Sequence, residues 1–102
     1  MATENATESA SLLEARVRLP QHVVYRTFVY ETVVLNLETG KYHGLNRTAG
    51  RMLDVVGKAE TIGQAAAQLA EEFSRPVDEI ESDLSAFCLE LQERGLIVID
   101  SA

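Results

Sequence analysis

The spacing of apolar and polar residues divides the chain into a strand-forming half and a helix-forming half. Residues 23–37 are rich in Val, Thr, Tyr and Phe, which suit a pleated, half-buried surface, and they predict two strands that break near residue 30. Gly40 ends a three-residue hairpin loop, because glycine adopts the left-handed conformation that such a loop requires. Residues 41–45 are therefore expected to return antiparallel to the strand 32–37.

A shorter alternation precedes these strands. Val17 and Leu19 alternate with Arg16 and Arg18 before Pro20 ends the run. This pattern predicts an irregular segment or a short edge strand.

Beyond residue 45 the apolar residues follow a helical period. Asn46 is a suitable N-cap, since its side-chain oxygen can accept a hydrogen bond from the first turn. The next apolar residues lie at i, i+3, i+4 and i+7 and predict a helix that Gly57 ends, namely Ala49, Met52, Leu53 and Val56. Thr61 and Gln64 form a capping box for a second helix, whose expected buried face is Ile62, Ala65, Ala66, Leu69 and Phe73.

A third helix is expected over residues 77–94. Pro76 precedes it, as proline is tolerated in a first turn, and Gly95 supplies its C-terminal stop. Residues 96–99 are a short apolar run that is expected to pack back on the core. The apolar face of the helix consists of Val77, Ile80, Leu84, Phe87, Cys88 and Leu91.

Together these elements predict an α+β fold in which a three-stranded antiparallel sheet is followed by three helices. Three helices beside a β-hairpin are typical of a winged helix-turn-helix, so DNA binding is one hypothesis. A helix in the major groove would need Lys and Arg for phosphates and base edges. The first two turns of the third helix instead carry carboxylates, at Asp78, Glu79, Glu81 and Asp83, which disfavour DNA as a partner.

Composition limits the class of protein further. The chain has 102 residues and fits one small domain, expected over residues 16–100. Residues 1–15 are expected to be a disordered tail, because positions 2–10 contain no large apolar residue. No segment approaches the roughly 20 apolar residues of a membrane span, and no signal peptide is evident, so a soluble, cytoplasmic protein is expected.

Charge is concentrated in the helical half. Residues 1–51 hold six Lys/Arg and five Asp/Glu, a net of +1, and residues 52–102 hold three and eleven, a net of −8; the sum is the total of −7. A basic segment would therefore suit the helices.

Catalytic chemistry finds little support in the sequence. His22 and His43, with the single cysteine Cys88, form no recognisable metal set, and no glycine-rich phosphate loop is present. Cys88 lies among apolar helix positions and is expected to be a buried hydrophobe. We therefore expect no catalytic residue, no metal and no cofactor, and predict that the chain is not an enzyme.

The strand 41–45 offers a different kind of site. If it is the last strand of the sheet, one side carries unpaired N–H and C=O groups that could accept an added peptide strand. Gly44 within it permits close approach of another backbone, or else it eases the turn into the helix at Asn46. Tyr42 and Gly44 share one face and Lys41, His43 and Leu45 the other.

These segments, in this order, resemble the PqqD-like family, which contains the leader-peptide recognition elements (RiPP recognition elements) of ribosomally made, modified peptides. The resemblance covers residues 16–99, and its strongest elements are Tyr42-x-x-Leu45-Asn46 and Leu91-x-x-x-Gly95-Leu96. Residues 42–46 look most similar to the stand-alone proteins of lasso-peptide clusters. One departure is Val56-Gly57-Lys58, where the family usually has Asp-Gly.

The resemblance implies a non-catalytic protein that binds the leader as a fourth strand between the third strand and the third helix. It would then deliver the leader to a maturation enzyme, such as a leader peptidase. The implied peptide-binding residues are Lys41, Tyr42, His43, Gly44 and Leu45 on the strand and Ile80, Asp83, Leu84 and Phe87 on the helix.

Two other functions stay open at this point. One is a winged-helix DNA-binding or regulatory module, and the other is a domain that recruits an enzyme without any leader. The expected partners are a precursor leader and a maturation enzyme, with no nucleic acid and no membrane, and the expected state is a monomer or weak dimer.

Overall fold

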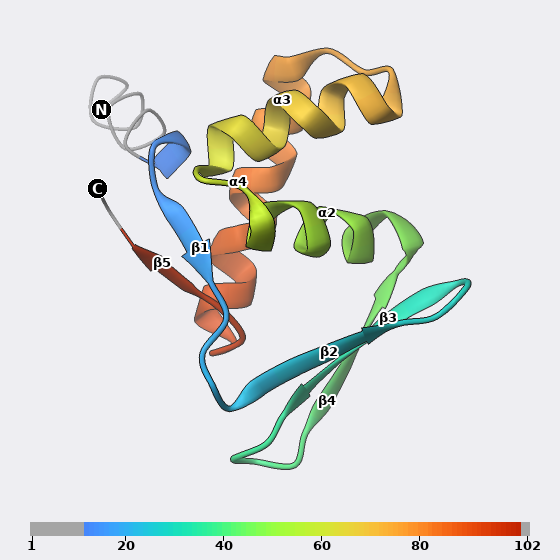
Figure 1. The fold of residues 1–102 in the computed structure, drawn as a ribbon, viewed down its shortest axis with the longest axis vertical. Helices are drawn as coiled ribbons and strands as arrows, with labels where there is room; N and C mark the ends of the chain where they lie inside the picture. The colour runs from blue at the N-terminus through green and yellow to red at the C-terminus, as the bar shows by residue number, and fades with distance from the viewer. Residues whose placement is uncertain (1–11, 101–102) are drawn as a thin grey trace.

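The computed structural model describes residues 12–100 and has the predicted fold class. Three antiparallel strands are followed by three helices, an α+β arrangement of the winged-helix type, and two short strands join the ends of the domain (Figure 1). Within residues 12–100, no helix has the length and apolar character needed to cross a membrane. The elements in chain order are β1 (Arg16–Arg18), β2 (Val23–Thr27), β3 (Glu31–Asn36), β4 (Tyr42–Asn46), α2 (Arg47–Lys58), α3 (Ile62–Phe73), α4 (Val77–Glu93) and β5 (Val98–Asp100).

The three-stranded sheet has the order β2-β3-β4, so β3 is the central strand. Val34 of β3 faces Tyr25 on one side and His43 on the other, and it is buried. The opposite face of the sheet carries Val24 and Tyr42, which are exposed. The three strands expected from the pattern are confirmed, with one face on the core.

Caps fix the start of two helices as expected. The Asn46 side chain accepts from the Ala49 N–H at 2.8 Å, and the Thr61 hydroxyl accepts from the Gln64 N–H at 3.0 Å. The Gln64 side-chain oxygen accepts from the Glu60 N–H at 2.8 Å rather than from Thr61, so the box is shifted by one residue.

The expectation that Gly57 ends the first helix is wrong. α2 continues through Gly57 to Lys58, and the Ala59 N–H still bonds the Val55 carbonyl at 3.0 Å. Positive φ among the described glycines occurs at Gly40 and Gly95. Gly57 therefore lacks the left-handed conformation that a glycine stop uses.

The ends of α3 and α4 use the same closing motif. At the end of α4, Gly95 has φ 75°, and the Leu96 N–H bonds back to the Leu91 carbonyl at 2.9 Å. At the end of α3, Ser74 takes the left-handed conformation, with φ 54° and ψ 48°. A non-glycine residue in that conformation carries strain of about 1–2 kcal/mol.

The two ends of the described domain form a second sheet that was not predicted. β1 pairs antiparallel with β5, with Arg16 opposite Asp100, and Arg18 Nε donates to Asp100 Oδ2 at 3.0 Å. Residues 96–97 are buried, which confirms that this run packs on the core.

Residues 12–15 of the expected tail contact the domain. Ala15 is buried, and its carbonyl accepts from the Ile62 N–H at 2.9 Å. The rest of the tail, residues 1–11, lies outside the described part of the chain, so its expected disorder stays a prediction.

A glycine sets the distance between α2 and the sheet. Gly50 is buried, and a Cβ added there would collide with Thr32 Oγ1 and lie 2.8 Å from the Thr32 Cβ. The missing side chain at Gly50 therefore allows α2 to approach β3 closely at this position. Because β4 leads directly into α2, this contact also positions β4.

Candidate functional site

β4 is an edge strand with one open side. It pairs with β3, and no other strand of residues 12–100 pairs with it. β2 forms the other edge of the sheet. The strand expected to accept a peptide is thus at an edge.

Hydrogen bonds show which groups of β4 face outward. The Asn36 N–H donates to the Lys41 carbonyl at 2.9 Å. In an antiparallel ladder, bonded and non-bonded pairs alternate, so His43 and Leu45 also bond across to β3. The N–H and C=O groups of Tyr42 and Gly44 consequently point away from β3, toward the open side.

The side chains of β4 alternate between two environments. Leu45 is buried and His43 is half-buried on the core side, whereas Tyr42 is 74% exposed on the other face with Gly44. Lys41 is exposed just before the strand. A strand added to β4 would thus place alternate side chains beside the core and beside Tyr42.

Nothing in the free protein forces a glycine at position 44. Its φ is not in the left-handed region, and the nearest atom to an added Cβ is Glu31 Oε2 at 3.7 Å, an ordinary contact. The idea that Gly44 admits another backbone stays a prediction.

The expected helix residues lie at different depths on α4. Ile80 and Leu84 are buried in the core, and Phe87 is half-buried and packs against it. Asp83 is exposed, and its Oδ2 accepts from Arg75 Nη2 at 3.2 Å. Of the four, Asp83 and Phe87 have surface available to a ligand, and contact of any of them with a peptide stays a prediction.

The charge on α4 is partly balanced by a residue outside the helix. Arg75 pairs with Asp83 and lies 3.8 Å from Glu79. Asp78 and Glu81 have no such ion pair within the described residues. The start of α4 keeps a negative surface.

Cys88 is buried, as predicted. Burial raises the pKa of its thiol to about 12, so it stays protonated at neutral pH and is a poor nucleophile. His22 Nε2 lies 3.7 Å from Glu38 Oε1. Among residues 12–100, no group of three His, Cys, Asp or Glu side chains is placed to hold a metal.

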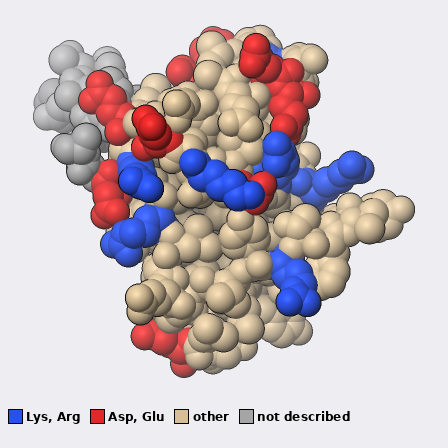
Figure 2. Space-filling model, viewed as in Figure 1, with Lys and Arg blue, Asp and Glu red and all other residues tan. Residues whose placement is uncertain are grey.

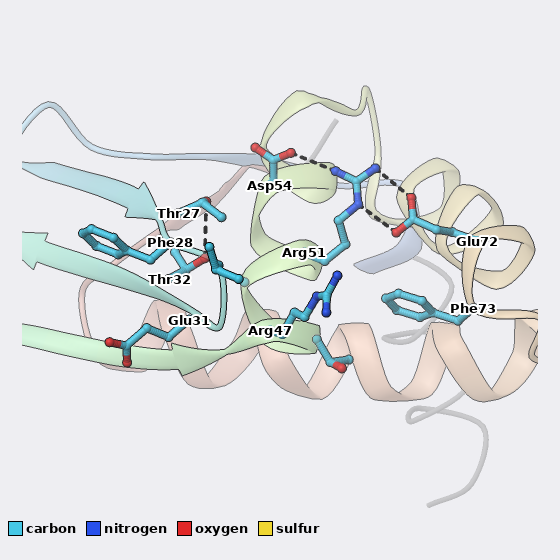
Figure 3. A pocket seen from close by; sticks show the side chains of 12 residues that line it. Thr27, Phe28, Glu31, Thr32, Arg47, Arg51, Asp54, Glu72 and Phe73 are labelled. Atoms are coloured by element: carbon cyan, nitrogen blue, oxygen red, sulfur yellow. Dashed lines mark hydrogen bonds and ion pairs between the residues drawn. The ribbon is translucent and has the colours of Figure 1, made fainter.

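An ion-pair network joins α2 to α3 and was missed from the sequence. Arg51 donates to both carboxylate oxygens of Glu72 at 2.7 Å and to Asp54 at 3.0 Å (Figure 3). The Tyr25 hydroxyl donates to Asp54 at 2.9 Å. The Arg51–Glu72 pair spans 21 positions, so no local pattern reveals it.

The network shifts several pKa values. The hydrogen bond from Arg51 lowers the pKa of Glu72. Burial raises the pKa of Asp54, but bonds from Tyr25 and Lys58 and the charges of Lys58 and Arg51 outweigh it and hold the pKa below its usual range. The pKa of Tyr25 is raised to about 12, mainly by burial and secondly by the hydrogen bond to Asp54.

This network borders a pocket of about 700 Å³. The β2–β3 turn, the first turns of α2 and the end of α3 line it. Arg47 and Phe73 point toward each other across it, while Glu31 points away (Figure 3). The pocket lies beside the turn of the sheet and does not include Tyr42 or Gly44.

Residues 31–97 match the family described as coenzyme PQQ synthesis protein D (PqqD). No curated protein matches the chain.

Two solved structures are similar to the chain, each at 25% sequence identity. One is TbiB1 in complex with the TbiA(beta) leader peptide, with a TM-score of 0.72 over 78% of this chain and 93% of that chain. The other is lasso peptide synthetase B1 complexed with the leader peptide, with a TM-score of 0.73 over 82% of this chain and 99% of that chain. Both of these similar proteins hold a leader peptide.

Proposed function

The chain belongs to the PqqD family, and from that membership we propose that it is a non-catalytic protein that binds the leader of a ribosomally made precursor peptide. The leader adds to β4 as a fourth strand of the sheet. The observation that carries this proposal is the outward direction of the Tyr42 and Gly44 main-chain groups. The two similar structures, each with a leader peptide, support it.

Main-chain bonds supply a large part of the affinity in this mode of binding. Tyr42 and Gly44 each offer one N–H and one C=O, so the edge can form four bonds with an added strand. Side chains supply the specificity, since alternate residues of the leader meet Tyr42 on one face and His43 on the other.

In this proposal the core-side half of the site is bordered by α4, where Asp83 and Phe87 contact leader side chains that point toward the helices. Leu45, Ile80 and Leu84 belong to the buried core of the protein. The unpaired carboxylates at the start of α4 favour a leader with Lys or Arg and speed its capture more than they tighten it. Carboxylates there also weaken the case for DNA as a ligand.

The protein then presents the bound leader to a maturation enzyme, for which a leader peptidase of a lasso-peptide pathway is our candidate. The chain's own groups supply no catalysis in this role, which is to hold the peptide as an ordered strand.

A scan of the leader by backbone N-methylation tests the proposal. A synthetic leader of the precursor encoded beside this protein is methylated at one amide at a time, and each Kd is measured by fluorescence anisotropy. Methylation at every second residue of the bound stretch should weaken binding roughly 2- to 13-fold, the effect of losing one hydrogen bond worth about 0.5–1.5 kcal/mol.

The intervening positions are the internal control, because their amides point away from β4. Failure of the unmodified leader to bind at tens of micromolar would contradict the proposed function. If the leader binds but the effect of methylation does not alternate from one residue to the next, the leader does not bind by strand addition.

A further inference from the structure

Three exposed apolar residues project from the side of the sheet. Phe28, Val29 and Tyr30 form the β2–β3 turn and are 53%, 73% and 80% exposed. Figure 2 shows this turn as an uncharged projection beside a band of basic side chains that lies over α2. We refer to these three residues as the tip.

Folding alone does not explain the residues of the tip. The turn is closed by a bond from the Phe28 N–H to the Glu31 carbonyl at 2.7 Å, which leaves a two-residue loop. Hairpin loops that need positive φ favour Asn, Asp and Gly, but Val29 and Tyr30 have negative φ, so the backbone does not dictate these side chains. Three neighbouring large apolar side chains that the fold leaves exposed point to a surface that is covered in function.

The tip lies beside the pocket between α2 and α3. Phe28 and Val29 line this pocket together with Phe73 and Arg47. The Arg51 charge in its wall is already neutralised by Glu72 and Asp54. Arg47 is exposed, and no carboxylate of the described residues lies within ion-pair distance of it.

The charge of this surface differs from that of the chain. Arg26, next to the tip on β2, also has no ion pair among residues 12–100. The total charge is −7, yet the unpaired charges of the described residues that border the tip are two cations, Arg26 and Arg47, and one carboxylate, Glu31, whose side chain points away from Arg47 (Figure 3). A partner for the surface would carry an apolar patch with carboxylates at its rim.

A second copy of the chain fits this surface poorly. In a two-fold dimer the same patch faces itself, so the patch that carries Arg26 and Arg47 would meet a patch with the same two cations. Each copy also carries a charge of −7. Both effects oppose pairing through the tip.

The tip stays accessible when β4 is occupied. β3 lies between β2 and β4, so a strand added to the open side of β4 does not cover β2 or its turn. Glu31 pairs with Asn46 at the end of β4, which places the tip near one end of the added strand.

We propose that the tip and the adjoining pocket, with Arg47, form the docking surface for the enzyme that acts on the bound leader, through an apolar and acidic patch of that enzyme. This inference rests on the proposed function, because the leader determines which enzyme is meant. The docked enzyme would lie next to one end of the leader strand.

A pair of binding measurements tests the inference. The purified leader-processing enzyme is titrated by calorimetry into the wild-type protein and into a V29S/Y30S double variant, each with and without leader. Leader affinity is measured separately by anisotropy. The double variant should bind the enzyme at least 10-fold more weakly and bind the leader within 2-fold of wild type.

Two further variants sharpen the readout. Leu37→Ser removes an apolar side chain of comparable exposure, 58%, from the other hairpin and should leave enzyme binding unchanged. Arg47→Gln should weaken enzyme binding at low salt and reduce its dependence on salt.

The outcomes separate this inference from the proposed function. Enzyme affinity that is unchanged in the double variant would overturn it, as would an equal loss of leader affinity. If sedimentation shows that the wild-type protein is a dimer and the double variant a monomer, the tip serves self-association, and this inference is overturned. A wild-type protein that fails to bind the leader bears on the proposed function alone, since the enzyme titration without leader still decides the role of the tip.

Discussion

Replacing Gly44 with proline should weaken leader binding while leaving the fold intact. Proline has no N–H, and at Gly44 this group points away from β3, so the ladder of the sheet loses no bond. The preceding residue, His43, is already in a strand, as a residue before proline prefers. The damage should therefore fall on the added strand.

The size of the effect follows from one lost main-chain bond. A bond worth about 0.5–1.5 kcal/mol corresponds to a Kd roughly 2- to 13-fold higher. The proline ring also projects toward the incoming strand, so the upper part of this range is expected. The free energy of unfolding should stay within about 1 kcal/mol of wild type.

His43→Pro is the matched control one residue away. The His43 N–H faces β3, so this change removes a ladder bond to Val34 and should cost about 1–3 kcal/mol of stability. Urea unfolding measures stability, and anisotropy with labelled leader measures affinity. The assignment of outward groups is refuted if Gly44→Pro binds leader like wild type, or if the two variants are equally stable.

Four other predictions address the scaffold. Gly50→Ala should lower the free energy of unfolding by about 1–3 kcal/mol, because the added Cβ clashes with β3. Gly57→Ala in the same helix should raise it by about 0.5–1 kcal/mol, because the nearest contact of an added Cβ there is an ordinary 3.6 Å. Equal effects of the two variants in urea unfolding would contradict this packing of α2 on β3. Ser74→Gly should stabilise the protein by about 1 kcal/mol, because glycine takes the left-handed conformation without strain; a lower Tm would be inconsistent with that account. The Cys88 thiol should react with a thiol reagent only in denaturant, and rapid native labelling would show that it is accessible. Arg51→Met should destabilise the protein at pH 7. This effect should fade progressively as the pH falls below the ordinary pKa of a Glu carboxylate, because Arg51 lowers the pKa of Glu72 and their ion pair contributes stability only while that carboxylate is ionised. A difference that persists at pH 2 would argue against the ion pair as its cause.

Features that depend on a few neighbouring residues could be predicted from the sequence. The caps at Asn46 and Thr61 and the stop at Gly95 act within one helical turn, and all three are observed. The strands of the sheet also followed from local composition and period. Gly57 shows the limit of such signals, because the sequence alone does not distinguish a glycine inside a helix from a glycine that ends one.

Features that join distant segments could not be predicted. The pairing of β1 with β5 and the Arg51–Glu72 hydrogen bond join residues that are far apart in the sequence, and no repeating pattern of residues connects them. Helical spacing placed Ile80, Leu84 and Phe87 on one face but did not show that the first two are fully covered by the core. The tip had a signal, because apolar residues occupy a predicted strand break, but only the structure showed their exposure.

The pairing of β1 with β5 bears on how such a domain can be joined to other proteins. Arg16 lies opposite Asp100, so the two ends of the domain leave it at one point. This point is on the side of the molecule away from the β2–β3 turn (Figure 1). A fusion at either end, or insertion of the whole domain into a loop of an enzyme, would leave β4 open. A linker long enough to reach from this point to the tip would then raise the effective concentration of the enzyme at the bound leader, replacing an encounter between separate molecules.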